Sequence, residues 1–216
     1  MKPRFDLSVY MITDPVLCGV HGLRGTVASG IRGGVTMVQL RDPYAKTRAL
    51  IETARALVAL TRPAGVLFIV NDRVDVALSV GADGVHVGQA DMDPGDARRL
   101  IGPDKILGLS ITEEADLERS NLSVVDYLGV GPIYPSATKA DAAPAMAIGG
   151  LRAIARQTKL PIVAIGGLHA GNAADAIEAG ADGVAVVSAI CSAPDPGEAA
   201  GELAAVVAAA REARRG

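Results

Sequence analysis

The sequence predicts an α/β protein, specifically a closed (β/α)8 barrel of the TIM-barrel type. Short β-branched apolar runs alternate with helix-forming segments along the 216 residues, and there are eight such runs. Eight strand–helix units in a chain of roughly 200 residues match the lower size limit of this barrel. The alternative with the same alternation is an open doubly wound sheet. It is disfavoured because no G-x-G-x-x-G motif opens the first helix.

The predicted strands are nearly continuous apolar runs, which is the pattern of strands buried on both faces. They are Val9–Thr13, Val35–Arg41, Val66–Asn71, Gly84–Gly88, Lys105–Ile111, Asp126–Gly131, Pro161–Gly167 and Gly183–Ala189. The clearest predicted helices between them are Thr47–Arg62, Asp93–Ile101 and Gly149–Lys159. In the first of these, the apolar residues Leu50, Ala54 and Leu57 fall on one helical face.

A short repeat supports a regular barrel. The heptapeptide GADGVHV at 81–87 recurs as GADGVAV at 180–186, and glycine in such turns ends one helix before the next strand begins. Gly-rich turns occur in any α/β protein, so the repeat alone is weak evidence. No linker, charge block or low-complexity segment divides the sequence, and we therefore expect one domain over residues 1–216.

Composition excludes several partners. The formal net charge is −3, from 21 Lys and Arg against 24 Asp and Glu, and aromatic residues make up 3% with no Trp. A chain of this kind lacks the basic and aromatic surface that binds nucleic acid. Its most apolar stretch, Ala199–Ala210, is interrupted by Glu202 and too short to span a membrane. We expect a cytoplasmic protein with two reduced cysteines, Cys18 and Cys191. The possibility of a homo-oligomer stays open.

Polar residues and glycines gather where the predicted strands end. Active sites of these barrels lie at the carboxyl ends of the strands. The residues found there are Gln39–Asp42, Asn71–Arg73, Gly88–Asp91, Ser110, the long loop Gly131–Asp141, Gly166–Gly167 and Val187–Ser188. The turns at the other end are mostly Gly-Ala-Asp. This asymmetry predicts a single active site at the carboxyl end.

Two segments have the composition of phosphate sites. Gly166–Gly167 and Val187–Ser188 follow the last two strands, where such barrels often bind phosphate through backbone N–H groups. The plainer alternative is a tight turn. The segment Ser136–Lys139 places two hydroxyls and an ammonium on the longest loop, although such clusters are often only solvated.

Asp72 and Asp91 follow neighbouring strands and suggest a Mg²⁺ shared with substrate phosphate. The alternative is that Asp72 caps the third helix and Asp91 starts a turn. His86 lies within a predicted strand, and we expect a hydrogen-bonded barrel residue rather than a general base. No Ser-His-Asp or Cys-His set for nucleophilic catalysis is evident.

At these residues the sequence resembles the thiamine phosphate synthase family, over nearly the whole chain from Val9 to about Ile190. Each matching segment is weak alone, and together they are specific. The segments are Val38–Arg41, Val70–Asp75, Gly81–Gln89, Leu107–Ser110, Tyr127–Pro135, Thr138–Lys139 and Ala164–Gly167. The resemblance implies a Mg²⁺-dependent barrel transferase of thiamine biosynthesis. Such an enzyme joins a 4-amino-2-methylpyrimidine, activated as its 5-diphosphooxymethyl ester, to a thiazole phosphate and releases pyrophosphate.

The resemblance also implies site residues. The pyrimidine diphosphate would be bound by Gln39, Leu40, Arg41, Asp42, Pro43, Asn71, Ser110 and Lys139. The thiazole phosphate would be bound by Ser136, Ala137, Thr138, Gly167, Val187 and Ser188. Asp72 and Asp91 would ligate Mg²⁺, and Arg41, Lys139 and Ser110 would serve the chemistry.

One position departs from the family pattern. The family usually has Lys where this chain has Pro43, so one cation near the diphosphate is missing unless Lys46 replaces it. Two alternative functions stay open. A thiazole tautomerase-like isomerase resembles the family but has His in the sixth-strand loop, where this chain has Pro132. A non-catalytic barrel that binds a phosphorylated metabolite would not need Asp72 and Asp91.

Overall fold

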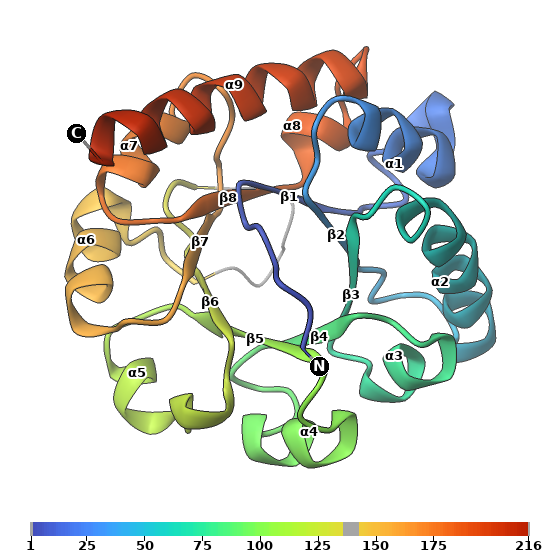
Figure 1. Cartoon of the computed structure of the whole chain (residues 1–216), viewed down its shortest axis with the longest axis horizontal. Coiled ribbons are helices and arrows are strands. Elements are labelled where there is room, and N and C mark those ends of the chain that lie inside the picture. Colours follow the sequence, from blue (N-terminus) through green and yellow to red (C-terminus); the bar gives the residue numbers. More distant parts are fainter. Residues whose placement is uncertain (1, 136–142, 216) are drawn as a thin grey trace.

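The computed structural model describes residues 2–135 and 143–215. Its eight strands pair in parallel, in chain order, and β1 also pairs with β8. The prediction of a closed (β/α)8 barrel is therefore confirmed, and Figure 1 shows the ring of strands inside the ring of helices. The strands are β1 (Val9–Ile12), β2 (Met37–Leu40), β3 (Leu67–Asn71), β4 (Gly84–Val87), β5 (Ile106–Ile111), β6 (Tyr127–Val130), β7 (Ile162–Ile165) and β8 (Gly183–Val186).

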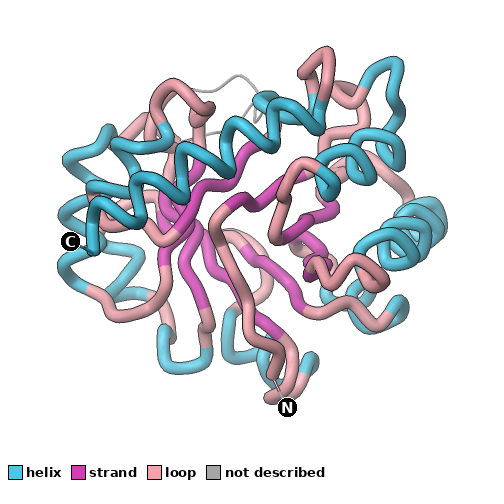
Figure 2. Tube along the Cα trace, turned by 45° about the horizontal axis from the view of Figure 1, so that its top comes forward, coloured by secondary structure: helices cyan, strands magenta, loops and turns pink. Residues whose placement is uncertain are grey.

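The helices follow the strands and cover the outside of the barrel (Figure 2). They are α1 (Gly22–Arg32), α2 (Thr47–Thr61), α3 (Val74–Val80), α4 (Pro94–Ile101), α5 (Ala115–Arg119), α6 (Ala147–Gln157), α7 (Ala173–Glu178), α8 (Ser188–Cys191) and α9 (Pro196–Arg215), with short 3-10 turns at Gly19–His21 and Leu122–Val124. The three helices expected from the sequence correspond to α2, α4 and α6. Asp93 caps α4, because its side chain accepts the backbone N–H groups of Gly95 and Asp96.

Two apolar layers hold the barrel together. The larger layer lies between strands and helices. The smaller one fills the barrel interior, where Tyr10, Met37 and Tyr127 are fully buried. Side chains alternate across each strand, so seven of the strands contribute to both layers, while β4 contributes only to the outer one. This explains why the strands have continuous apolar runs in sequence.

The N-terminal segment closes one end of the barrel. In Figure 1 it runs from the N-terminus across the barrel opening before it enters β1. Leu7 is buried in the interior layer, and the ring of Phe5 lies 6.0 Å from that of Tyr127. Because this segment lies ahead of β1, the end that it covers is the amino end of the strands. The carboxyl end, where ligands bind in such barrels, is the opposite end.

A recurring aspartate fastens the amino end. Asp83, Asp126 and Asp182 directly precede β4, β6 and β8. Each accepts a backbone N–H of the preceding strand, from Phe68, Leu107 and Ile162, at 2.8–2.9 Å. Two of these aspartates belong to the repeated Gly-Ala-Asp turns. The repeat therefore encodes a bond between neighbouring strands. Among the described residues, no helix is both long and apolar enough to span a bilayer.

Candidate active site

The segment after β2 combines one buried and several accessible groups. Gln39 is buried, and its Nε2 donates to the Tyr10 hydroxyl at 2.8 Å. Leu40 packs between strands and helices, so only its backbone faces the rim. Arg41 is partly exposed, and its N–H donates to Thr13 Oγ1.

Asp42 shapes the loop that follows. Its Oδ1 accepts the N–H groups of Tyr44 and Ala45 at 3.1 and 3.0 Å, so the carboxylate turns the chain toward α2. Pro43 and Lys46 are exposed on either side of that turn. Arg41 directly follows β2, and Lys46 directly precedes α2.

Asn71 and Asp72 lie at the end of β3 in an unusual backbone. Asp72 has φ +58°, a left-handed conformation that few residues other than glycine adopt and that Asp tolerates better than most residues. Asn71 Nδ2 donates to Asp72 Oδ2 at 2.6 Å. The residue directly before α3 is Arg73, whose own side chain does not cap the helix. Backbone strain of this kind is concentrated at functional sites.

Asp91 closes the turn after β4. Its Oδ2 accepts the N–H of Gly88 at 2.8 Å, and its own N–H donates to the carbonyl oxygen of Gly88. Asp91 therefore belongs to a turn but ends it rather than starting it, and this position does not exclude ligation by the same carboxylate. Asp91 is exposed, which leaves it accessible to an ion from solvent.

The carboxylates of Asp72 and Asp91 fit Mg²⁺ in kind and in number. No cluster of three or more His, Cys, Asp or Glu side chains occurs in the described parts of the chain. Mg²⁺ commonly takes one or two carboxylates and completes its octahedron with water and substrate phosphate. Two carboxylates on neighbouring loops suit an ion that arrives with a diphosphate.

Ser110 is the last polar side chain of β5 and contacts His86 on β4. Ser110 Oγ lies 2.9 Å from His86 Nε2, and His86 Nδ1 lies 2.9 Å from the Tyr127 hydroxyl. His86 is thus a hydrogen-bonded barrel residue, as expected. Burial raises the pKa of Tyr127 well above its ordinary value, and burial also raises the pKa of Tyr10. Both hydroxyls stay protonated.

The Gly166–Gly167 turn after β7 supports the neighbouring loop. Both glycines have positive φ, and a Cβ on Gly166 would lie 2.5 Å from the Cβ of Pro132. The turn therefore requires glycine because the β6–α6 loop packs directly on it. Asn172 Nδ2 donates to the carbonyl oxygen of Gly167 and fixes the turn. Within residues 2–135 and 143–215, the N–H of Gly167 donates to no protein acceptor.

Val187 and Ser188 connect β8 to the single turn of α8. Ser188 is the first residue of that turn and is exposed, while Val187 is partly buried. The carbonyl oxygen of Val187 accepts the N–H groups of Ile190 and Cys191. The backbone N–H groups at the start of the turn point toward its N-terminal end, opposite to the carbonyl oxygens, and such groups suit an anion. Ser136, Ala137, Thr138 and Lys139 lie outside the described residues.

Sequence reasoning missed Tyr10 and Tyr127. Their hydroxyls lie 2.9 Å apart inside the barrel and connect Gln39 to His86. A signal was present in Gly108, where a Cβ would lie 2.2 Å from the Tyr127 ring and 2.4 Å from His86 Nδ1. Glycine inside a strand often marks the close approach of another group.

The fold and the site define a class first. A barrel with carboxylates, a glycine turn and an exposed hydroxyl at the carboxyl end has the architecture of the (β/α)8 enzymes. Comparison with known proteins identifies the family. The family model described as thiamine monophosphate synthase matches residues 9–190, and the chain belongs to this family.

Similar proteins agree with this assignment. A thiamine-phosphate synthase of Xanthobacter autotrophicus is 56% identical over 98% of this chain and 100% of the relative. One of Azorhizobium caulinodans is 53% identical with the same coverage. The solved thiamine phosphate pyrophosphorylase from Pyrococcus furiosus superposes with a TM-score of 0.86 at 38% identity, over 94% of this chain and 96% of that one. These names favour the synthase over the isomerase and the non-catalytic binder.

Proposed function

We propose that this chain is a transferase that makes thiamine phosphate. It would join the diphosphate ester of the hydroxymethylaminopyrimidine to the thiazole phosphate and release pyrophosphate. The observation that carries the proposal is membership of the synthase family along almost the whole chain, with relatives of that name above 50% identity. The geometry supports it, because Asp72, Asp91, Ser110 and the Gly166–Gly167 turn all lie at the carboxyl end.

The pyrimidine diphosphate would occupy the side of the rim formed by β2 to β5. Gln39, Arg41 and Asn71 would hold it, together with the backbone of Leu40–Pro43 and with Lys139. Asp72 and Asp91 would hold Mg²⁺, which supplies positive charge against the diphosphate oxygens. Arg41 and Lys139 would add positive charge against the same diphosphate. Negative charge on a leaving group is stabilised best by groups already in position.

The reaction needs no protein nucleophile. The amino group of the pyrimidine donates electron density to the exocyclic methylene as the C–O bond to the diphosphate breaks, so a carbocation is accessible. The thiazole nitrogen then forms the new C–N bond. Gly167, Val187, Ser188 and Ser136–Thr138 would hold the thiazole phosphate and place that nitrogen. The protein orients both partners and excludes water from the cation.

The direct test is reconstitution. The purified chain is mixed with both substrates and Mg²⁺, and pyrophosphate and thiamine phosphate are measured separately. We expect equimolar formation of the two products, and loss of both when a chelator removes the metal. Folded protein that yields neither product would reject the proposal. Product formation that persists after chelation would reject only the role of Mg²⁺.

We also propose a cytoplasmic location. Free cysteines are typical of reducing compartments, and Cys18 and Cys191 are both free and buried. The proposed ligands are small phosphorylated molecules rather than nucleic acid or membrane. Sedimentation at several concentrations would decide between a monomer and a homo-oligomer.

A further inference from the structure

A line of hydrogen bonds crosses the barrel interior beneath the candidate active site. It joins five side chains from five strands, which we call the buried network: Gln39, Tyr10, Tyr127, His86 and Ser110. Its four contacts measure 2.8, 2.9, 2.9 and 2.9 Å in that order. The two ends, Gln39 and Ser110, are both proposed contacts of the pyrimidine substrate. The middle three residues are buried.

The network has a direction. The amide nitrogen of Gln39 can only donate, so the Tyr10 hydroxyl accepts from it. If Tyr127 also donated to Tyr10, the Tyr10 hydroxyl oxygen would accept from both of its neighbours. Its own hydrogen would then have no acceptor among these contacts. Buried hydroxyls are almost always satisfied. Tyr10 therefore donates to Tyr127, and Tyr127 donates to His86 Nδ1.

This direction fixes the last two members. A neutral imidazole that accepts at Nδ1 carries its hydrogen on Nε2. His86 Nε2 then donates to Ser110 Oγ. The Ser110 hydroxyl has one hydrogen, and this arrangement leaves that hydrogen for a partner at the rim. Ser110 is only partly buried, at the end of β5.

The barrel makes room for this arrangement. Gly108 and Gly129 occupy interior positions beside the rings, and a Cβ on Gly129 would lie 3.0 Å from His86 Cε1. At Gly108 the same change would overlap both Tyr127 and His86. The rings are therefore packed as well as hydrogen-bonded, which holds the imidazole in one orientation.

We propose that Tyr127 is a positioning residue that acts through His86 to present the Ser110 hydroxyl as a hydrogen-bond donor to the pyrimidine substrate. The proposal rests on the proposed function for the identity of that substrate. A ring nitrogen of an aminopyrimidine is the matching acceptor. The thiazole phosphate, which would bind at β7 and β8, is not touched by the network.

A double-mutant cycle tests this coupling. Tyr127→Phe removes one hydroxyl, and we expect kcat/KM for the pyrimidine diphosphate to fall by about tenfold, the value of one good hydrogen bond. KM for the thiazole phosphate should not change. In a Ser110→Ala background the same substitution should change kcat/KM by less than about twofold, because the group through which it acts is gone. Tyr44→Phe, at a tyrosine that is 91% exposed, is the matched control.

A measurement without substrate covers the case in which Tyr127→Phe folds poorly. The ¹⁵N shifts of His86, assigned with a His86→Gln variant, report which ring nitrogen carries hydrogen. We expect the Nε2–H form alone in the unmodified protein and a mixture in Tyr127→Phe. A wild-type Nδ1–H form, or equal losses of kcat/KM in both backgrounds, would overturn the proposal. An unmodified protein that makes no product would instead reject the function, and the ¹⁵N result would still decide the network.

Discussion

The two ends of the barrel use the same residue type for opposite purposes. At the amino end, Asp83, Asp126 and Asp182 are each hydrogen-bonded to the backbone of a neighbouring strand. At the carboxyl end, Asp72 is held in a left-handed backbone and Asp91 sits exposed on a turn. An aspartate that precedes a strand is thus bonded to the backbone of the neighbouring strand. An aspartate that follows a strand is bonded within its own loop, to Asn71 in the case of Asp72 and to Gly88 in the case of Asp91.

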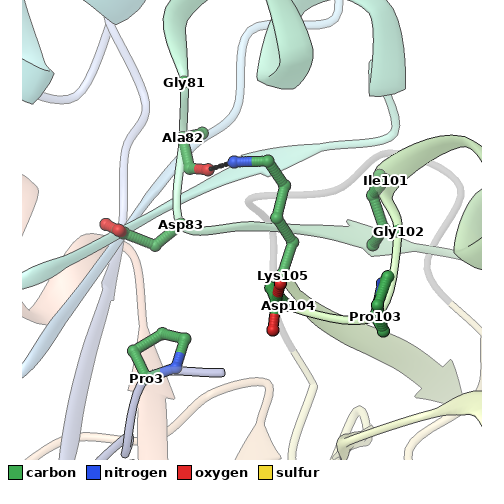
Figure 3. A pocket seen from close by; sticks show the side chains of 9 residues that line it. All are labelled: Pro3, Gly81, Ala82, Asp83, Ile101, Gly102, Pro103, Asp104 and Lys105. Atoms are coloured by element: carbon green, nitrogen blue, oxygen red, sulfur yellow. Dashed lines mark hydrogen bonds between the residues drawn. The ribbon is translucent and has the colours of Figure 1, made fainter. Parts of the chain in front are cut away.

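The cavity at the amino end fits this division. It measures about 400 Å³ and is lined by Pro3, Gly81–Asp83 and Ile101–Lys105 (Figure 3). Its polar groups already have protein partners. Lys105 Nζ donates to the carbonyl oxygen of Ala82, as the dashed line in Figure 3 marks, and Asp83 accepts the N–H of Phe68. We therefore assign no ligand to this cavity.

The largest expected effect separates the two kinds of aspartate. Asp91→Ala should lower turnover by roughly a hundredfold or more, because Mg²⁺ loses a ligand and its positive charge no longer stabilises the leaving diphosphate. The melting temperature should change little. Asp91→Asn should lower turnover in the same way, because the amide carries no negative charge for Mg²⁺. This variant keeps the turn, since its amide oxygen can still accept the N–H of Gly88. Turnover as a function of Mg²⁺ concentration is the measurement. Normal turnover of Asp91→Ala at the usual Mg²⁺ concentration would make Asp91 a turn residue only.

Asp83→Ala is the matched change at the other end. It leaves a buried strand N–H without its acceptor, which costs about 1–3 kcal/mol of unfolding free energy. Activity per folded molecule should be unchanged. Denaturant unfolding measures the loss. An activity defect in well-folded Asp83→Ala protein would contradict the division between the two ends.

A second pair tests the anion site. Ser188→Asp should weaken thiazole phosphate binding on the order of tenfold, because a carboxylate would face the phosphate dianion. Binding of the pyrimidine diphosphate should change much less. Ala64→Asp adds the same charge to an exposed turn at the amino end and should affect neither. Calorimetry with each substrate decides, and equal losses for both substrates would refute the assignment of Ser188.

A third pair compares glycines with positive φ. In Gly166→Ala the new Cβ would lie 2.5 Å from the Cβ of Pro132, and the backbone conformation would also be unfavourable. In Gly102→Ala the backbone conformation is likewise unfavourable, but the new Cβ would have no atom within 4 Å. We expect Gly102→Ala to cost about 1 kcal/mol of stability and Gly166→Ala more. Only Gly166→Ala should also raise KM for the thiazole phosphate. A parallel rise in Gly102→Ala would show that KM responds to stability rather than to the rim.

The smallest expected effect concerns Pro43. Pro43→Lys restores a cation near the diphosphate, and a part-exposed contact is worth at most about 1 kcal/mol, or roughly fivefold in affinity. The added backbone freedom opposes part of that gain. The comparison is binding of the pyrimidine diphosphate against the same pyrimidine without phosphates. A gain for both compounds would mean that loop geometry, and not charge, is what changed.

The strand count and order were predictable because buried parallel strands have a distinctive apolar pattern. Strand ends were less so. The run Pro161–Gly167 continues two residues past β7, because Gly166 and Gly167 are apolar in composition but left-handed in conformation. The hydrogen bond between Tyr10 and Tyr127 was not predictable, because these residues lie on β1 and β6, which are far apart in the sequence. The register between neighbouring strands decides which side chains face the barrel interior. The order of apolar and polar residues along a single strand does not determine that register.

The closure of the barrel affects how the protein is made. β1 pairs with β8, and Asp6, ahead of β1, pairs with Arg211 in α9. On the ribosome, the first strand therefore emerges long before its last partner has been synthesised. Until then one edge of β1 has no strand to pair with, and the apolar interior is exposed. An unpaired strand edge favours association with other chains. The barrel can therefore close only after β8 has been synthesised and has paired with β1.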